Sequence, residues 1–161
     1  MIFRRYKSGI IFKVVNKVMF KLSGVEIMKN NRIELIEGFR HQLKDILESS
    51  KQAIYVYLDD THKLCNQRFA TLLGYGSTRE WENIGMSFPE AFVANQSRET
   101  LVSAYQNAMK DKIGSTIDII WKKKGGGQVN TNVILVPVSF GDELLALHFI
   151  TEEVDRLVRS E

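Results

Sequence analysis

Runs of β-branched and aromatic residues predict where the sheet of this chain begins. Residues 53–58 read AIYVYL, a composition typical of a strand. Residues 59–61 read DDT and predict a turn, and residues 62–65 predict a short return strand. The sheet is therefore expected to start with two consecutive strands.

Three longer strands are predicted near the end of the chain. Residues 115–123 alternate apolar and polar positions, and so do residues 128–139. Between them, the glycines of residues 124–127 supply the positive φ that a tight hairpin turn needs. Residues 143–150 are apolar on both faces apart from His148, which predicts a central strand.

The segment between these two groups of strands predicts helices. Asn66 is placed to cap a short helix over residues 66–73, and Gly74 follows as its stop signal. Short helical turns are expected within residues 75–92, and a longer amphipathic helix over residues 97–112. Strands and helices grouped in this way predict an α+β fold with an antiparallel sheet.

An amphipathic helix is predicted ahead of the first strand, over residues 31–50. Its apolar stripe repeats at spacings of three, four and three residues and consists of Ile36, Phe39, Leu43 and Ile46. Two interpretations stand together. The stripe can cover the sheet of its own domain, or it can form a dimer interface with its counterpart.

A basic amphipathic pattern lies further upstream, over residues 10–22, with Lys13, Lys17 and Lys21 on one face. The segment is too short and too charged to span a bilayer, and no small-residue cleavage site marks it as a secretory signal. Three interpretations are open. It binds a membrane surface or an acidic partner, it docks on the body or on a second subunit, or it precedes the natural product, whose domain-like sequence starts just after Met28.

Charge separates the same end from the rest of the chain. The net charge is +3, but residues 1–29 hold seven basic residues against one acidic residue, so the remainder is net acidic. An acidic body excludes a basic stripe for nucleic acid. Cys65 is the only cysteine, so no intrachain disulfide can form and a reducing, cytoplasmic location is expected.

Specific residues in this order resemble the PAS domain family. Residues 53–81 follow the family's opening pattern of a strand, an acidic turn, a short strand, Asn-x-x-Phe, Gly-Tyr and a capped helix. Residues 116–150 are similar to the family's three closing strands, with Gly-Gly in a turn where the family usually has Asp-Gly. The matching positions of the opening pattern are Asp59, Asn66, Phe69, Gly74, Tyr75, Ser77 and Glu80.

The resemblance implies the PAS fold, a five-stranded antiparallel sheet with helices on one side and an N-terminal amphipathic helix. It divides the chain into a basic extension (1–29), an N-terminal helix (30–52), the PAS domain (53–151) and a short C-terminal helix (152–161). It also implies a sensory or signal-transduction module that binds a small ligand or a protein partner and signals as a homodimer.

Each familiar chemistry lacks a required residue, so no enzyme activity and no particular cofactor is expected. Cys65 ends the second strand, whereas a flavin photosensor of this superfamily carries its reactive cysteine on a helix, so a buried structural thiol is expected. The helix over residues 97–112 holds no histidine for haem. One cysteine and three scattered histidines do not supply a metal site.

Five residues are the candidate ligand contacts, because ligand pockets are mostly apolar with few polar groups. They are Phe69, Phe88, Phe92, Trp121 and His148. The aromatic residues either pack as core or line a cavity. His148 either lies on the outer face under the N-terminal helix, donates a hydrogen bond to a ligand, or ligates iron.

Three classes of function are compatible with these patterns. The first is a sensor whose ligand state alters how its flanking helices pair. The second is an interaction scaffold whose core is filled by side chains. The third is a small cone-shaped isomerase or dehydratase, for which Asp118 and His148 are the only candidate groups on strands.

Overall fold

The computed structural model describes residues 31–153 of a chain that divides into two compact units, residues 1–35 and 36–161. The described part of the first unit, residues 31–35, is helical. The expected extension over residues 1–29, its basic pattern over 10–22 and most of the expected C-terminal helix lie outside the described residues.

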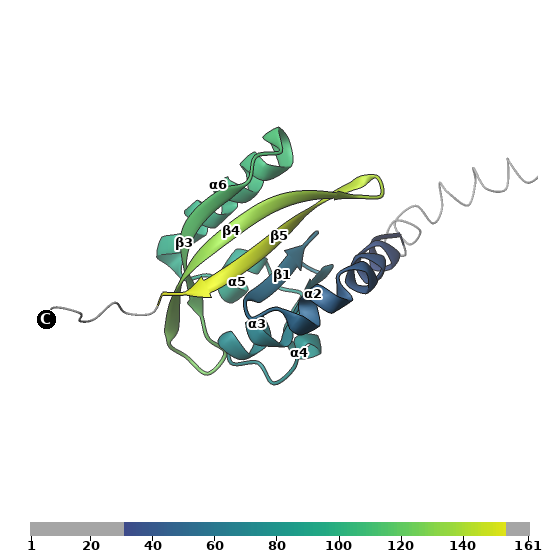
Figure 1. The fold of residues 1–161 in the computed structure, drawn as a ribbon. Helices are drawn as coiled ribbons and strands as arrows, with labels where there is room; N and C mark the ends of the chain where they lie inside the picture. The colour runs from purple at the N-terminus through teal and green to yellow at the C-terminus, as the bar shows by residue number, and fades with distance from the viewer. Residues whose placement is uncertain (1–30, 154–161) are drawn as a thin grey trace, which may run out of the picture. The chain divides into compact units, whose positions relative to one another are not determined.

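Five antiparallel strands form one sheet in the order β2-β1-β5-β4-β3 (Figure 1). The strands are β1 (Ala53–Tyr57), β2 (Lys63–Cys65), β3 (Ser115–Lys122), β4 (Gln128–Phe140) and β5 (Glu143–Glu152). The apolar strand β5 is central, as its sequence predicts. A C-terminal helix is expected over residues 152–161. Its predicted start is wrong, because Glu152 still belongs to β5, where it pairs with Thr131 of β4.

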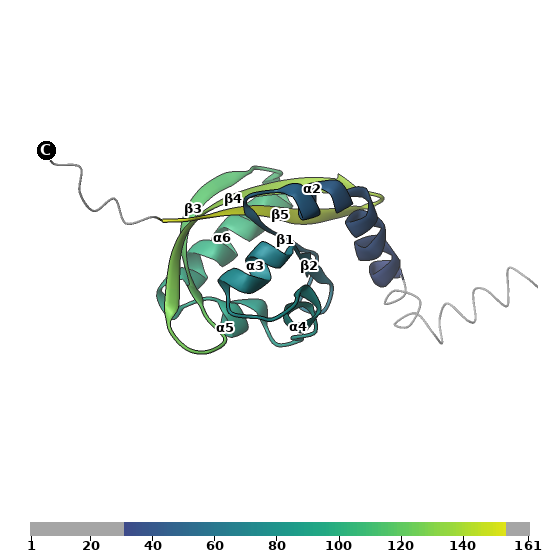
Figure 2. The same ribbon diagram turned by 60° about the horizontal axis from the view of Figure 1, so that its bottom comes forward.

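Four helices cover one face of this sheet, which we call the inner face (Figure 2). They are α3 (Gln67–Leu72), α4 (Thr78–Glu82), α5 (Phe88–Phe92) and α6 (Asn95–Asp111). Side chains alternate along a strand, so Tyr55 and Tyr57 of β1 and Ile119 and Trp121 of β3 share this face. Their burial against the helices forms the main core.

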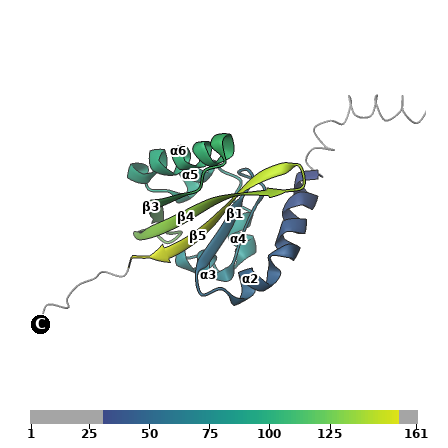
Figure 3. The same cartoon turned by 45° about the horizontal axis from the view of Figure 1, so that its top comes forward.

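The opposite, outer face of the sheet is approached by the chain that precedes β1. Residues 36–42 are helical, Leu43 interrupts them, and α2 (Lys44–Ser49) follows. Figure 3 shows that this segment runs from the hairpin end of β4 and β5 toward the start of β1. Phe39 packs edge-on against Phe140 at the end of β4, with ring centroids 5.1 Å apart. Phe140 belongs to the outer face, because it is an odd number of positions from the inward Leu135.

The predicted stripe of this helical segment is covered along part of its length only. Ile36 and Phe39 are buried at 5% and 4% exposure within a single chain, Leu43 is half-buried, and Ile46 is 50% exposed. The first two positions therefore pack within the chain, as one of the two interpretations expects. A dimer contact of this stripe stays a prediction, and its accessible part is Leu43 and Ile46.

Asn66 joins the first strand to the first inner helix. Its side-chain oxygen accepts from the backbone N–H of Ile54 (3.0 Å) and of Phe69 (3.1 Å). Its amide nitrogen donates to the carbonyl of Gln52 at 2.9 Å. The residue is thus both the predicted helix cap and a buried bridge between α3 and β1.

Replacing this bridge should destabilise the fold strongly. Asn66→Ala leaves the N–H groups of Ile54 and Phe69 buried without acceptors, and we expect the free energy of unfolding to fall by about 2–4 kcal/mol. Urea unfolding followed by circular dichroism measures it. The control Asn107→Ala lies on the exposed side of α6 and should change stability by less than about 0.5 kcal/mol. Equal effects of both substitutions would contradict the assignment.

Candidate functional site

Aromatic rings fill the deepest part of the inner face. Tyr55 stacks on Phe69 at 4.8 Å, Phe69 meets Trp121 edge-on at 5.4 Å, and Trp81 packs on Phe92 at 5.2 Å. The indole N–H of Trp121 donates to the Thr131 hydroxyl at 2.7 Å. This packing leaves the centre of the inner face occupied by the protein's own side chains.

A cavity of about 230 Å³ lies beside this cluster, between β1, β5, α5 and α6. We call it the His148 cavity. Aromatic and aliphatic side chains make most of its wall, and none of the described residues that line it carries a formal charge. The lining residues are Tyr55, Tyr57, Phe88, Pro89, Leu101, Val102, Tyr105, Gln106 and His148.

His148 is a buried polar residue in the wall of this cavity. It pairs in register with Tyr55 of β1, and its ring stacks on the Tyr55 ring at 3.9 Å and 10°. The residue is 2% exposed, and its Nδ1 has no hydrogen-bond partner among the described residues. Burial lowers the pKa of His148 to about 3, although the backbone carbonyls of Tyr55 and Ala146 act in the opposite direction. The imidazole is therefore neutral at physiological pH.

The expectation that His148 lies on the outer face under the N-terminal helix is wrong. Its neighbours Leu147 and Phe149 have the outward positions, while His148 shares the inner face with Ala146 and Ile150. Because β5 is apolar on both faces, its sequence alone does not decide which face is which. Pairing with Tyr55 settles the orientation.

Tyr57, at the opening of the cavity, is connected to the start of α5 by hydrogen bonds through Asp60. Its hydroxyl donates to Asp60 Oδ1 at 3.0 Å, and the same oxygen accepts from the backbone N–H of Phe88 at 2.9 Å. Burial and, less strongly, the Asp60 carboxylate raise the pKa of Tyr57, so its phenol stays protonated. The Tyr57 ring also meets Tyr105 of α6 edge-on at 5.2 Å. The three elements around the opening are thereby connected.

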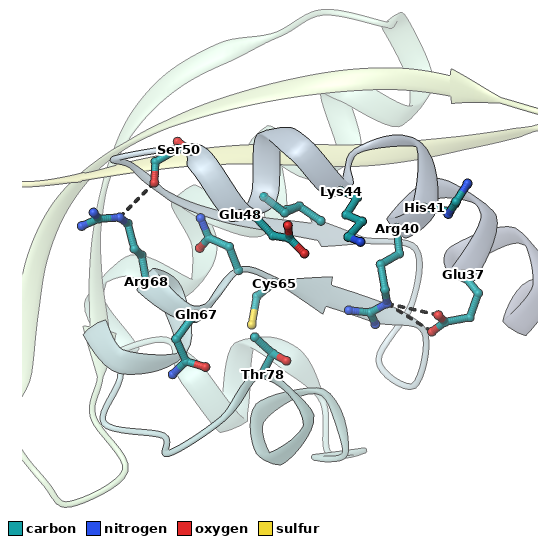
Figure 4. A pocket seen from close by; sticks show the side chains of 12 residues that line it. Glu37, Arg40, His41, Lys44, Glu48, Ser50, Cys65, Gln67, Arg68 and Thr78 are labelled. Atoms are coloured by element: carbon teal, nitrogen blue, oxygen red, sulfur yellow. Dashed lines mark hydrogen bonds and ion pairs between the residues drawn. The ribbon is translucent and has the colours of Figure 1, made fainter.

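A second hollow, a groove of about 590 Å³, lies between residues 37–50 and the region of α3 and the start of α4 (Figure 4). Its cations are largely engaged by the protein itself. Arg40 donates to both carboxylate oxygens of Glu82, at 3.1 and 2.9 Å, and Arg68 donates to the Ser50 carbonyl at 2.9 Å. Cys65 also lines the groove, and burial raises the pKa of its thiol, so the thiol stays protonated and unreactive.

Glu82 links the helix before β1 to the body of the domain. It holds Arg40 in a bidentate pair, and its Oε1 also accepts from the Cys65 backbone N–H at 3.1 Å. A bidentate, charge-assisted pair of this kind fixes both position and orientation. The arrangement ties residues 36–42, β2 and α4 to one carboxylate.

Lys63 is a buried cation whose ammonium group binds to carbonyl groups of the protein itself. Its ammonium group donates to the carbonyls of Asp60, Glu82 and Ile84, at 2.7, 3.2 and 2.5 Å. Because all three N–H donors are used, no hydrogen remains for a ligand. Burial lowers the pKa of Lys63, with Asp60 and Glu82 acting in the opposite direction.

The structure separates the five predicted ligand contacts into two groups. Phe88 and His148 line the cavity, whereas Phe69, Phe92 and Trp121 pack within the filled aromatic cluster. Contact of any of them with a ligand stays a prediction. Sequence reasoning missed Tyr55, Tyr57 and Tyr105 as cavity residues. The signals were present in the alternation of β1 and in the apolar stripe of α6.

The pair of groups considered for an isomerase or dehydratase does not converge. Asp118 lies on the outer side of β3, exposed, and accepts from the side chain of Asn132 at 3.0 Å. His148 faces the interior on the other side of the sheet. The catalytic hypothesis built on these two residues is therefore wrong.

Within residues 31–153, no three histidine, cysteine, aspartate or glutamate side chains form a metal-binding group. No helix in the same residues is long and apolar enough to cross a membrane.

Comparisons with known proteins agree with this architecture. The PAS domain family matches residues 41–103. A PAS domain from Colwellia psychrerythraea superimposes with a TM-score of 0.58 and 20% identity, covering 73% of this chain and 99% of that one. The PAS domain of an HTR-like protein from Haloarcula marismortui gives 0.52 and 21%, covering 76% and 98%. That of the fruit-fly ELK potassium channel gives 0.54 and 15%, covering 71% and 97%.

No curated protein shows significant sequence similarity to the chain. The sheet order, the helical cover of one face and the family match together define an α+β domain with the PAS fold. The chain contains a PAS domain. PAS domains are generally sensory or signalling modules and are typically not catalytic.

The buried imidazole makes stability depend on pH in a specific direction. Below the ordinary pKa of 6.5, His148 is protonated in the unfolded chain. In the folded protein it stays unprotonated down to about pH 3. Acid therefore favours unfolding, and this contribution to stability should fall by about 1.5 kcal/mol between about pH 6.5 and pH 5. In His148→Phe, which lacks the titrating group, that part of the loss should disappear.

Urea unfolding at several pH values measures the difference between the two proteins. The control His41→Gln alters an exposed helical residue and should follow the wild-type curve. Parallel stability curves for wild type and His148→Phe would show that His148 is protonated alike in the folded and unfolded states.

Proposed function

We propose that this chain is a sensory, signal-transduction PAS module that binds a small molecule in the His148 cavity. The observation that carries the proposal is an apolar cavity with a buried, neutral imidazole whose Nδ1 has no partner among the described residues. A buried polar atom without a partner lowers stability by about 1–3 kcal/mol. A polar ring among apolar lining residues is typical of a site that positions a ligand.

The route of the signal in this proposal follows direct contacts from the cavity to the helix before β1. Tyr55 forms part of the cavity wall and packs on Trp81 of α4, with ring centroids 6.0 Å apart. Glu82 follows Trp81 in the chain and holds Arg40 of the helical segment. A displacement of Tyr55 by a ligand would therefore reach residues 36–42 through one ring contact, one step along the chain and one ion pair.

In this proposal, the signal is passed on by formation of a homodimer, or by a signalling protein that binds the same surface as the second copy. Two apolar side chains support it by their exposure, Ile46 on α2 at 50% and Ile134 on the outer face of β4 at 43%. Burial of such residues against a second copy would remove them from water. Ile36 and Phe39, already covered within the chain, would take part only if the helical segment moved.

A second candidate function is an interaction scaffold with a filled core. The observation that favours it is the packed aromatic cluster at the centre of the inner face. The two candidates differ in whether the remaining cavity holds a small molecule, so one experiment separates them.

Ligand binding is tested by native mass spectrometry and a visible spectrum of the freshly purified protein, together with a variant that fills the cavity. We expect a co-purified small molecule, or one captured from a metabolite extract, on the wild type. Val102→Trp should reduce its occupancy at least about tenfold, because a bulky side chain takes the ligand's volume.

Ser103→Trp is the matched control, because it adds the same side chain at the neighbouring exposed position of α6. It should retain the molecule. A wild-type protein that captures no small molecule would favour the scaffold instead. Equal binding by both tryptophan variants would place the molecule outside the His148 cavity and contradict the proposed site.

The proposed route predicts that the Arg40–Glu82 pair holds the helical segment in place. Glu82→Gln and Arg40→Met should each speed amide hydrogen exchange across residues 36–49 by about five- to thirtyfold, equivalent to about 1–2 kcal/mol. Glu37→Gln removes the exposed partner of Arg40 and should change exchange less than about twofold. Unchanged exchange in the first two variants would remove this pair from the route.

A further inference from the structure

We infer that the His148 cavity takes a small, uncharged, planar aromatic molecule with one hydroxyl or N–H group, of the phenol or indole type. This inference rests on the proposed function, because it names the chemical class of ligand for the same cavity. It follows from four properties of the cavity: its volume, the lack of charge on its wall, its aromatic lining and the buried imidazole of His148.

The volume limits the ligand to one or two fused rings. A cavity of about 150 Å³ in a protein core accommodates benzene, and the His148 cavity measures about 230 Å³. Drug-sized ligands and larger cofactors use about 300–1,000 Å³. The space beside Tyr55 therefore fits a ring system of phenol or indole size and is too small to enclose a complete flavin or haem.

The wall gives no compensation for a charged ligand. None of the described lining residues is acidic or basic, and burial keeps His148 neutral above about pH 3. The nearest carboxylate, Asp60, is outside the lining and accepts from Tyr57 and Phe88. An ion moved into this cavity would lose its hydration without gaining a counterion, at a cost of several kcal/mol.

The arrangement of rings in the wall suits a flat molecule. His148 and Tyr55 present a stacked pair, while Tyr57 meets Phe88 at 5.2 Å and 73° and Tyr105 at 5.2 Å and 88°. Five of the lining residues therefore carry rings: Tyr55, Tyr57, Phe88, Tyr105 and His148. Aromatic ligands gain about 0.5–1.5 kcal/mol per stacked or edge-on contact beyond the burial of their area.

The polar requirement comes from His148. A neutral imidazole has one nitrogen that donates and one that accepts. Nδ1 is fully buried without a partner among the described residues, so in this inference the ligand bonds to the other ring nitrogen, Nε2. A hydroxyl group meets either tautomer, because it both donates and accepts, and an indole N–H meets an accepting nitrogen. The other polar groups of the lining are Gln106, exposed on α6, and the hydroxyls of Tyr55, Tyr57 and Tyr105. The Tyr57 hydroxyl already donates to Asp60, so most of the ligand faces aromatic and aliphatic surface.

The test compares probes that differ in one property each, by isothermal titration calorimetry on the full chain. Phenol and indole should bind the wild type. Benzoate, a charged ring of similar size, should bind at least about tenfold more weakly than phenol, and flavin mononucleotide should not bind. His148→Phe preserves an aromatic ring but not the polar atoms, so it should weaken phenol binding by about five- to tenfold. The affinity for toluene should stay within about twofold.

A measurement on the wild type keeps the inference testable if His148→Phe is poorly folded. The ¹⁵N chemical shifts of the His148 ring should move on addition of phenol and not on addition of toluene. Benzoate binding as tightly as phenol, equal loss of phenol and toluene in His148→Phe, or ring shifts identical for phenol and toluene would each overturn the inference. A co-purified molecule of another class, lost in Val102→Trp, would overturn the inference and leave the proposed function standing. The proposed function itself fails if the wild type binds neither these probes nor any metabolite.

Discussion

The stacking of Tyr55 on His148 joins the two strands on which the inner face of this domain depends. Tyr55 lies on β1 and His148 on the central β5, and their rings are parallel at 3.9 Å. The other face and edges of Tyr55 meet Phe69, Phe88 and Trp121, so one side chain connects the sheet to α3 and α5. The position of Tyr55 therefore determines both the filled core and the cavity beside it.

The aromatic cluster explains why the cavity is small and placed to one side. Large rings pack at native density only when they interlock, and here they occupy the centre of the inner face. The space that remains lies where α6 presents Leu101, Val102 and Tyr105 toward β1. Any bulk added to this space on the side of the aromatic cluster would require the core itself to move.

Partly buried charges connect this apolar interior to the helical segment before β1. Glu82 is held by Arg40 and by the Cys65 backbone, and Lys63 is held by three carbonyls near the same end of α4. Each group is satisfied by specific partners, as burial of ions requires. Loss of one partner would leave a poorly solvated charge, so the position of the helical segment and that of α4 depend on each other.

The sequence by itself determined the strands, the caps at Asn66 and Ser77, the glycine hairpin and the central place of β5, because each depends on local periodicity or turn chemistry. It also identified Phe88 and His148 among the candidate contacts. Only the tertiary structure decided that His148 faces inward, that Tyr55, Tyr57 and Tyr105 border the same cavity, and that Phe69 and Trp121 pack away from it. The physical reason is that a strand apolar on both sides carries no mark of its buried face, and which rings interlock depends on residues far apart in the chain.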